Sequence, residues 1–366
     1  MSLRPYHEES LRLPATEDAA SAATKWDWGE VLLDHVAYMV DKKNHTSADL
    51  RFKRNLDGKE VDVQVSFCFA KPPRVSYFCC HAYFPDDKGE DDTCLFFCEP
   101  YVFATDGDLA LIILCIGRGR PSPFDTEKRT FFNPYTKKSM KTNTPSICDI
   151  DMVITIGGSS RGIIGWVDLS NGILLSDMLA DSTPCRPLRY VALPKPTQPP
   201  NWLPLAIDIG CHFRDIVLVK KTGIIRFVDL QVHADPSIPC SETPCGWTVL
   251  TWTLEGLHDG LDLETLDDLH FQPEHELHSH DISGYNLPQS FFVSNPILSS
   301  STDDVLYLRT NASSATNRDS RVIAVDIKHE MLLDVKEFDM QRPNNYMRTC
   351  ISSHLMPHGT VPSPPR

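Results

Sequence analysis

GWVDLSNGILL, residues 165–175, holds two apolar segments around a short polar stretch, Ser170-Asn171-Gly172. Asn and Gly are typical turn residues. Apolar runs this short, and rich in Val, Ile, Leu and Trp, favour strands over helices. This stretch therefore predicts two antiparallel strands joined by a tight turn, with Asp168 capping the turn through its side-chain oxygen.

The same pattern recurs twice further along the chain. AVDIKHEMLL, residues 324–333, again has an apolar–Val–Asp–apolar segment, three polar residues and a second apolar segment. FVDL, residues 227–230, repeats the first half. Asp168, Asp229 and Asp326 hold equivalent positions, so we expect each to cap a turn rather than to act in acid–base catalysis.

Strand signals also dominate the rest of the chain. VDVQVSF, residues 61–67, alternates apolar and polar side chains, and WTVLTW, residues 247–252, is rich in β-branched and aromatic types. Hairpins that recur along one chain are typical of β-propellers. We predict an all-β, propeller-like fold of short antiparallel strands, with one minor helical insertion near residues 255–270. The irregular repeat spacing leaves the number of blades open.

The two ends of the chain differ from its body. Residues 1–25 show no sustained periodicity and residues 357–366 are rich in Pro, so we expect a disordered leader and a disordered tail. With 41% hydrophobic residues, the 366-residue chain can bury a sizeable core. We predict one propeller-like domain over residues 26–356.

Charge and apolar patterning exclude several classes of protein. The chain has 35 Lys and Arg against 49 Asp and Glu, a net charge of −14, and an acidic surface repels nucleic-acid phosphates. Its longest apolar run, residues 109–116, is too short to cross a bilayer, and no signal peptide is visible. Twelve cysteines without a secretion signal indicate a reducing compartment. We expect a soluble, intracellular protein of the cytoplasm or nucleus that is not secreted.

One segment fits a catalytic motif but lacks the context of that motif. GSSRG, residues 158–162, matches the G-x-S-x-G nucleophile elbow, with Ser160 as the nucleophile. The elbow requires a helix after the serine, whereas residues 163–167 have the composition of a strand. A Gly/Ser-rich hairpin turn explains the segment more simply. We assign no catalytic residue and keep Ser160 as the one candidate.

Two clusters offer metal ligands. The imidazoles of His275, His278 and His280 could coordinate a metal ion, although the interleaved glutamates fit a solvated loop better. Cys79 and Cys80, followed by a histidine, could contribute to a zinc site. Cys94 and Cys98 of the same cluster flank three bulky apolar residues inside a predicted strand, so we expect buried, unreactive thiols instead. We therefore predict no bound metal and no cofactor.

The order of these motifs resembles a plant family, much expanded in grasses, that is named only as domain of unknown function 1618. The resemblance covers about residues 160–330 and includes an Arg214-Asp215 strand. It implies blade-like hairpins similar to the propellers that follow F-boxes in plant substrate receptors, although the leader does not supply the helices of an F-box. The motif residues that carry it are Gly165, Trp166, Asp168, Gly172, Asp229, Trp247, Trp252 and Asp326.

No candidate active site meets the geometric requirements of its own chemistry. We therefore expect a non-catalytic protein-interaction module that presents a propeller face to another protein. The alternative is an enzyme, or a small-molecule or metal binder, that uses the propeller channel through Ser160 or through the His and Cys clusters. Neither nucleic acid nor a membrane is expected as a partner.

Overall fold

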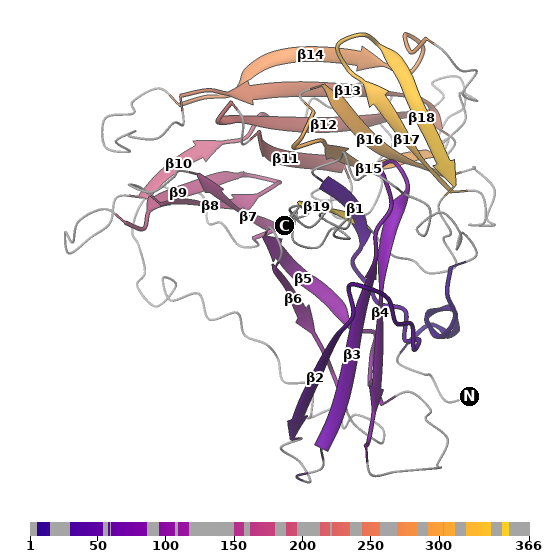
Figure 1. Ribbon diagram of the computed structural model, residues 1–366. Helices are drawn as coiled ribbons and strands as arrows, with labels where there is room; N and C mark the ends of the chain where they lie inside the picture. Colours follow the sequence, from indigo (N-terminus) through magenta and orange to yellow (C-terminus); the bar gives the residue numbers. More distant parts are fainter. Residues whose placement is uncertain are drawn as a thin grey trace, which may run out of the picture. The chain divides into compact units, whose positions relative to one another are not determined.

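A computed structural model of the chain contains almost only strands (Figure 1). Among the described residues helical structure is limited to a short 3-10 helix, η1 (Glu8–Leu11), and to Phe213 directly before β11 (Arg214–Val219), which confirms the all-β prediction. The helical insertion expected near residues 255–270 falls mainly on residues outside the described set. The structure describes residues 6–14, 30–53, 58, 60–85, 95–106, 109–116, 150–156, 162–179, 188–195, 213–219, 222–234, 244–256, 269–283, 292–302, 304–311, 320–337 and 346–350.

The chain divides into two compact units. The first unit comprises Met1–Lys141 together with Asp339–Arg366, and the second unit comprises Thr142–Phe338. The sequence indicated one domain over residues 26–356, and that extent stays a prediction.

The first unit contains a five-stranded sheet in which the C-terminal strand pairs with the N-terminal one. Strands β1 and β4 run parallel, whereas the other neighbours are antiparallel. A separate hairpin joins β5 (Tyr101–Asp106) to β6 (Leu109–Ile113). The five-stranded sheet has the order β19 (Tyr346–Cys350), β1 (Glu30–Asp34), β4 (Val75–Tyr83), β3 (Glu60–Cys68) and β2 (Ala48–Lys53).

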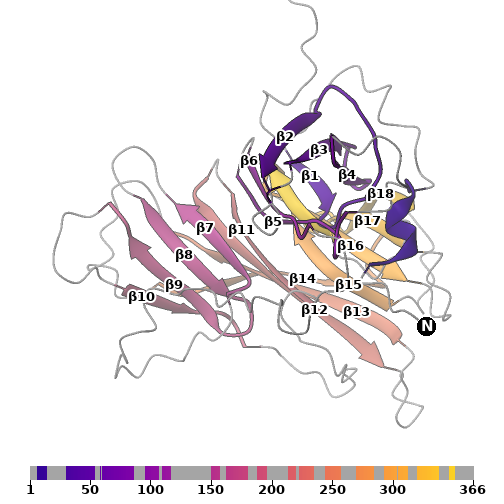
Figure 2. The same ribbon diagram turned by 90° about the horizontal axis from the view of Figure 1, so that it is seen from below.

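The second unit contains three four-stranded antiparallel sheets, and in each of them neighbouring strands are consecutive in the chain (Figure 2). This meander is the topology of a propeller blade, which confirms the propeller-like character of the fold. Blade 1 consists of β7 (Met152–Ile156), β8 (Ile163–Asp168), β9 (Gly172–Asp177) and β10 (Leu188–Ala192). Blade 2 consists of β11 (Arg214–Val219), β12 (Ile224–Ala234), β13 (Pro244–Leu254) and β14 (Gln272–His278). Blade 3 consists of β15 (Phe292–Leu298), β16 (Val305–Asn311), β17 (Arg321–Asp326) and β18 (Met331–Glu337).

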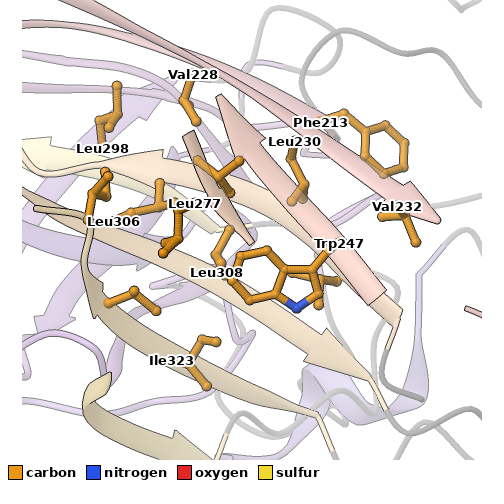
Figure 3. Packing of buried hydrophobic residues seen from close by; sticks show 14 of the residues in the cluster. Phe213, Val228, Leu230, Val232, Trp247, Leu277, Leu298, Leu306, Leu308 and Ile323 are labelled. Atoms are coloured by element: carbon orange, nitrogen blue, oxygen red, sulfur yellow. The ribbon is translucent and has the colours of Figure 1, made fainter. Parts of the chain in front are cut away.

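Blade 2 is buried on both of its faces. Side chains alternate along β12, so Ile225 and Phe227 pack against blade 1, whereas Val228 and Leu230 pack against blade 3. Figure 3 shows the second of these interfaces, in which Trp247 also lies. A strand buried on both faces carries apolar residues at both odd and even positions, as β12 does (IIRFVDLQV), although three of its buried residues are polar.

Candidate functional site

Two of the three repeated aspartates cap turns. Asp168 Oδ1 accepts hydrogen bonds from the backbone N–H groups of Ser170 and Asn171, at 2.9 and 3.1 Å. Asp326 Oδ1 accepts one from the N–H of His329 at 2.9 Å. The turn-capping prediction is therefore confirmed for both residues, and their carboxylates are not arranged as an acid–base pair.

The prediction is wrong for Asp229, which lies inside β12 and faces a buried arginine. Arg214 Nε donates to Asp229 Oδ1 at 2.8 Å, and the two side chains are 1% and 4% exposed. Arg214 Nη1 also donates to the carbonyl of Leu169 at 2.8 Å. Asp229 is not followed by the polar residues of a turn, so the chain continues as a strand to Ala234. The hydrogen bond to Leu169 connects blade 2 to the β8–β9 turn of blade 1, and the ion pair, which lies within blade 2, holds the guanidinium in this position.

A second set of polar contacts fastens blade 2 to blade 3. Asp215 Oδ2 accepts the backbone N–H of Leu298 at 2.9 Å in the buried interface. The guanidinium of Arg226 donates to Glu274 Oε2 at 2.8 and 3.1 Å and lies 3.6 Å from Asp304. The Arg-Asp motif of β11 is therefore an inter-blade connection on both sides of the sheet rather than a catalytic pair.

One group of side chains has the composition of a metal site. Glu274, His275 and Asp304 place their ligand atoms within 4.8 Å of one another. A bulge opposite Thr251 in the β13–β14 ladder brings adjacent residues to the same side of the strand. Two carboxylates and one imidazole suit a divalent cation. Arg226 already supplies the positive charge at this place, so a metal could bind here only after the guanidinium had moved.

The three candidate histidines of the sequence do not converge. His275 lies with Glu274, whereas His278 and His280 stack on each other with ring centroids 5.2 Å apart. His278 Nδ1 lies 2.9 Å from the hydroxyl of Thr248, which in turn lies 2.8 Å from His233 Nε2. His233 of β12 and His278 of β14 are therefore connected through the hydroxyl of Thr248 on β13, and His280 stacks on His278. We call these residues the histidine row.

His233 belongs to this row, and sequence reasoning missed it. The signal was its position two and four residues after Gln231 and Asp229, because residues at even spacing on a strand share a face. Burial, and secondly the nearby His278, lower the pKa of His233. Its Nδ1 has no hydrogen-bond partner among the described residues.

We expect the free energy of unfolding to fall as the pH drops below the range in which unfolded His233 takes up a proton. A histidine with a lowered folded pKa binds fewer protons when folded, so stability is complete above the unfolded pKa of about 6.5 and is lost below it. The loss stays under about 1.4 kcal/mol per pH unit, because solvent screens the partly exposed ring. Urea unfolding of the wild type and of His233→Gln between pH 8 and 5 measures it. An unchanged pH dependence in the variant would contradict this role.

The remaining residues singled out in the sequence do not belong to the clusters described above. Ser160 lies outside the described residues, so the nucleophile-elbow hypothesis stays a prediction. Gly165 lies between Ile154 and Leu175, where a Cβ atom would come within 2.8 Å of the isoleucine. Trp252 packs at the edge of the core between blades 1 and 2.

The outer face of blade 1 carries an apolar row that runs across all four strands. Val153 pairs with Trp166, Trp166 with Leu174, and Leu174 with Tyr190, and directly paired residues share a face of the sheet. Val153 is 54% exposed and the other three are partly exposed, whereas Ile154 on the inner face is 9% exposed. We call this face the apolar row. A second row beside it consists of Thr155, Ile164, Ser176 and Leu188.

Residues 166–307 match the family described as "Protein of unknown function (DUF1618)". No curated protein matches the chain. The matched segment runs from β8 into β16 and includes the Arg214–Asp229 pair and both of its neighbouring interfaces. The resemblance inferred from the motifs is confirmed over residues 166–307. Among the described residues no helix has the length and apolarity to cross a bilayer.

Proposed function

We propose that the protein is a non-catalytic protein-interaction module whose partner binds the apolar row of blade 1. The observation that carries the proposal is the row itself, which presents one apolar side chain from each of four adjacent strands. Trp and Tyr are the side chains most enriched at the energetic centres of protein interfaces. A flat sheet face with a central tryptophan suits a protein surface better than a small ligand, which requires a concave site.

Several polar side chains of the second unit form hydrogen bonds or ion pairs within the protein, which supports the same function. Asp168 and Asp326 cap turns, Arg214 pairs with Asp229 and donates to Leu169 of blade 1, and Arg226 pairs with Glu274 and lies near Asp304 of blade 3. These groups are saturated by protein partners, so none of them is placed to act on a substrate. The rigid frame they build is suited to holding a binding face.

We expect a photo-crosslinking side chain at position 153 to capture a partner protein from an extract. The matched control carries the same group at Met331, which is 42% exposed on the outer strand of blade 3. In the protein labelled at position 153, Trp166→Ala should lower the yield at least tenfold, because a central aromatic side chain contributes about 2 kcal/mol or more to binding. The melting temperature of each variant checks that the fold is intact.

Two outcomes would contradict this proposal. Equal adducts from positions 153 and 331 would mean that the apolar row has no specific partner. An adduct of twice the mass of the chain would identify the row as a self-association surface rather than a site for another protein.

A further inference from the structure

Two cysteines of the first unit lie close together on one face of its five-stranded sheet. Cys68 pairs with Tyr77 across β3 and β4, and Cys79 pairs with Ser66, so the two thiols are diagonal neighbours. They pack in one cluster with Tyr77 and are 5% and 1% exposed. Cys80 belongs to a different core cluster on the opposite face of β4. The Cys79-Cys80-His pattern of the sequence therefore does not converge on one metal site.

Several hydrogen-bond donors surround the sulfur of Cys68. The thiol of Cys79 donates to it, and Asn44 Nδ2 approaches it at 3.7 Å. Lys42 Nζ donates to the hydroxyl of Tyr77 at 3.0 Å, which places a positive charge beside the pair. Donors and a nearby cation stabilise a thiolate relative to a thiol.

The acidities of the three buried thiols differ accordingly. The hydrogen bond from Cys79, followed by those from Tyr77 and Asn44 and by the charge of Lys42, lowers the pKa of Cys68 to about 6. The same hydrogen bond and burial raise the pKa of Cys79, which therefore stays a neutral thiol. Burial alone raises the pKa of Cys80 to about 12. Cys80 is buried, as expected, and Cys68 belongs to none of the motifs of the sequence.

We propose that Cys68 and Cys79 form a peroxide-responsive dithiol that oxidises to a disulfide across β3 and β4. The thiolate of Cys68 attacks one oxygen of a hydroperoxide, the O–O bond breaks, and the released alkoxide or hydroxide takes up a proton. Cys68 is then a sulfenic acid. The sulfur of Cys79 attacks the sulfur of Cys68, the S–S bond forms, and water leaves with the proton of Cys79. In sum, two thiols are oxidised and one hydroperoxide is reduced to an alcohol and water, or to two waters from hydrogen peroxide.

The geometry restricts which oxidants can act. Both sulfurs are almost completely covered, so hydrogen peroxide, which is only slightly larger than water, is favoured over bulky reagents. Cys68 and Cys79 are diagonal neighbours on adjacent strands, so formation of the disulfide requires a local adjustment of β3 and β4. Exposed Cys245 offers an internal comparison for nonspecific oxidation.

The test is a titration of the full-length reduced protein with hydrogen peroxide at pH 7, followed by non-reducing peptide mapping. We expect a linked pair of peptides containing Cys68 and Cys79, lighter than the separate peptides by two hydrogen atoms, before Cys245 is oxidised. Cys79→Ser should leave a sulfenic acid at Cys68, which dimedone traps once the oxidised protein is unfolded in the presence of the probe, because the folded protein covers this sulfur. Lys42→Met should slow the oxidation most clearly below pH 6, where each unit by which the thiol pKa rises lowers the thiolate fraction about tenfold.

The matched control is Cys80→Ser, which removes the neighbouring buried thiol on the other face of the strand. It should form the Cys68–Cys79 disulfide at the wild-type rate. The proposal is overturned if both cysteines stay reduced while Cys245 is oxidised, or if Cys79→Ser gives no trapped adduct at Cys68. Circular dichroism of each variant confirms that a missing product does not reflect loss of the fold.

Discussion

Arg214→Met should destabilise the second unit by about 3–5 kcal/mol, the cost of removing one partner from a buried ion pair. The substitution leaves the carboxylate of Asp229 without its countercharge and the carbonyl of Leu169 without its donor. It also removes the guanidinium that lies 5.5 Å from the ring of Phe227. Urea unfolding of the full chain, followed by tryptophan fluorescence, measures the loss.

The pH dependence of the free energy of unfolding of Arg214→Met distinguishes the loss of a countercharge from the loss of packing. Burial raises the pKa of Asp229 and the adjacent guanidinium opposes that shift. Without Arg214 the pKa rises further, so the folded state binds a proton that the unfolded state releases. The variant should therefore be least destabilised at low pH and lose stability as the pH rises.

A double variant provides the control for Arg214→Met. Arg214→Met combined with Asp229→Leu removes both charges and should recover much of the lost stability, because an apolar pair can replace a buried ion pair. A single-variant loss below about 1 kcal/mol, or a double variant no better than the single, would show that the buried ion pair does not stabilise the second unit.

Gly172→Ala should destabilise the second unit by about 1–3 kcal/mol through overpacking. A Cβ atom at this position would lie 2.5 Å from the carbonyl oxygen of Val191 and 2.6 Å from the ring of Tyr190. The first neighbour is backbone, paired across β9 and β10, and cannot rotate away. Relief requires the two strands to separate, so we also expect weaker pairing of β10.

Gly162→Ala is the matched control for this substitution. Its added Cβ would meet the side chain of Leu179 at 3.0 Å, and that side chain is 61% exposed and able to move. Thermal unfolding should show almost no change for Gly162→Ala and a clear fall in Tm for Gly172→Ala. Equal effects of the two substitutions would refute the steric explanation.

Local sequence patterns were sufficient to predict hairpins of the second unit. The turn residues after Asp168 and after Asp326 predicted both caps, because a turn cap depends on residues only two or three positions away. The aromatic and β-branched run at residues 247–252 predicted β13 for the same reason. The propeller-like class followed from the repetition of such hairpins.

The contacts between elements could not be predicted in this way. Asp229 looked like a third cap, and its true partner, Arg214, lies in another strand. The acidity of Cys68 depends on Lys42 and Asn44, which lie 26 and 24 residues before it in the chain.

Alternation, turn chemistry and composition are properties of neighbouring residues, and from them the chain's strands, its hairpins and its family resemblance could be inferred. Which strand packs on which, and which polar groups are thereby buried together, depends on the folding of distant segments. Burial and long-range pairing set the charge state of Asp229 and Cys68, because desolvation and donated hydrogen bonds arise only once those segments meet. The apolar row has the same origin, since its four side chains become neighbours through strand register alone.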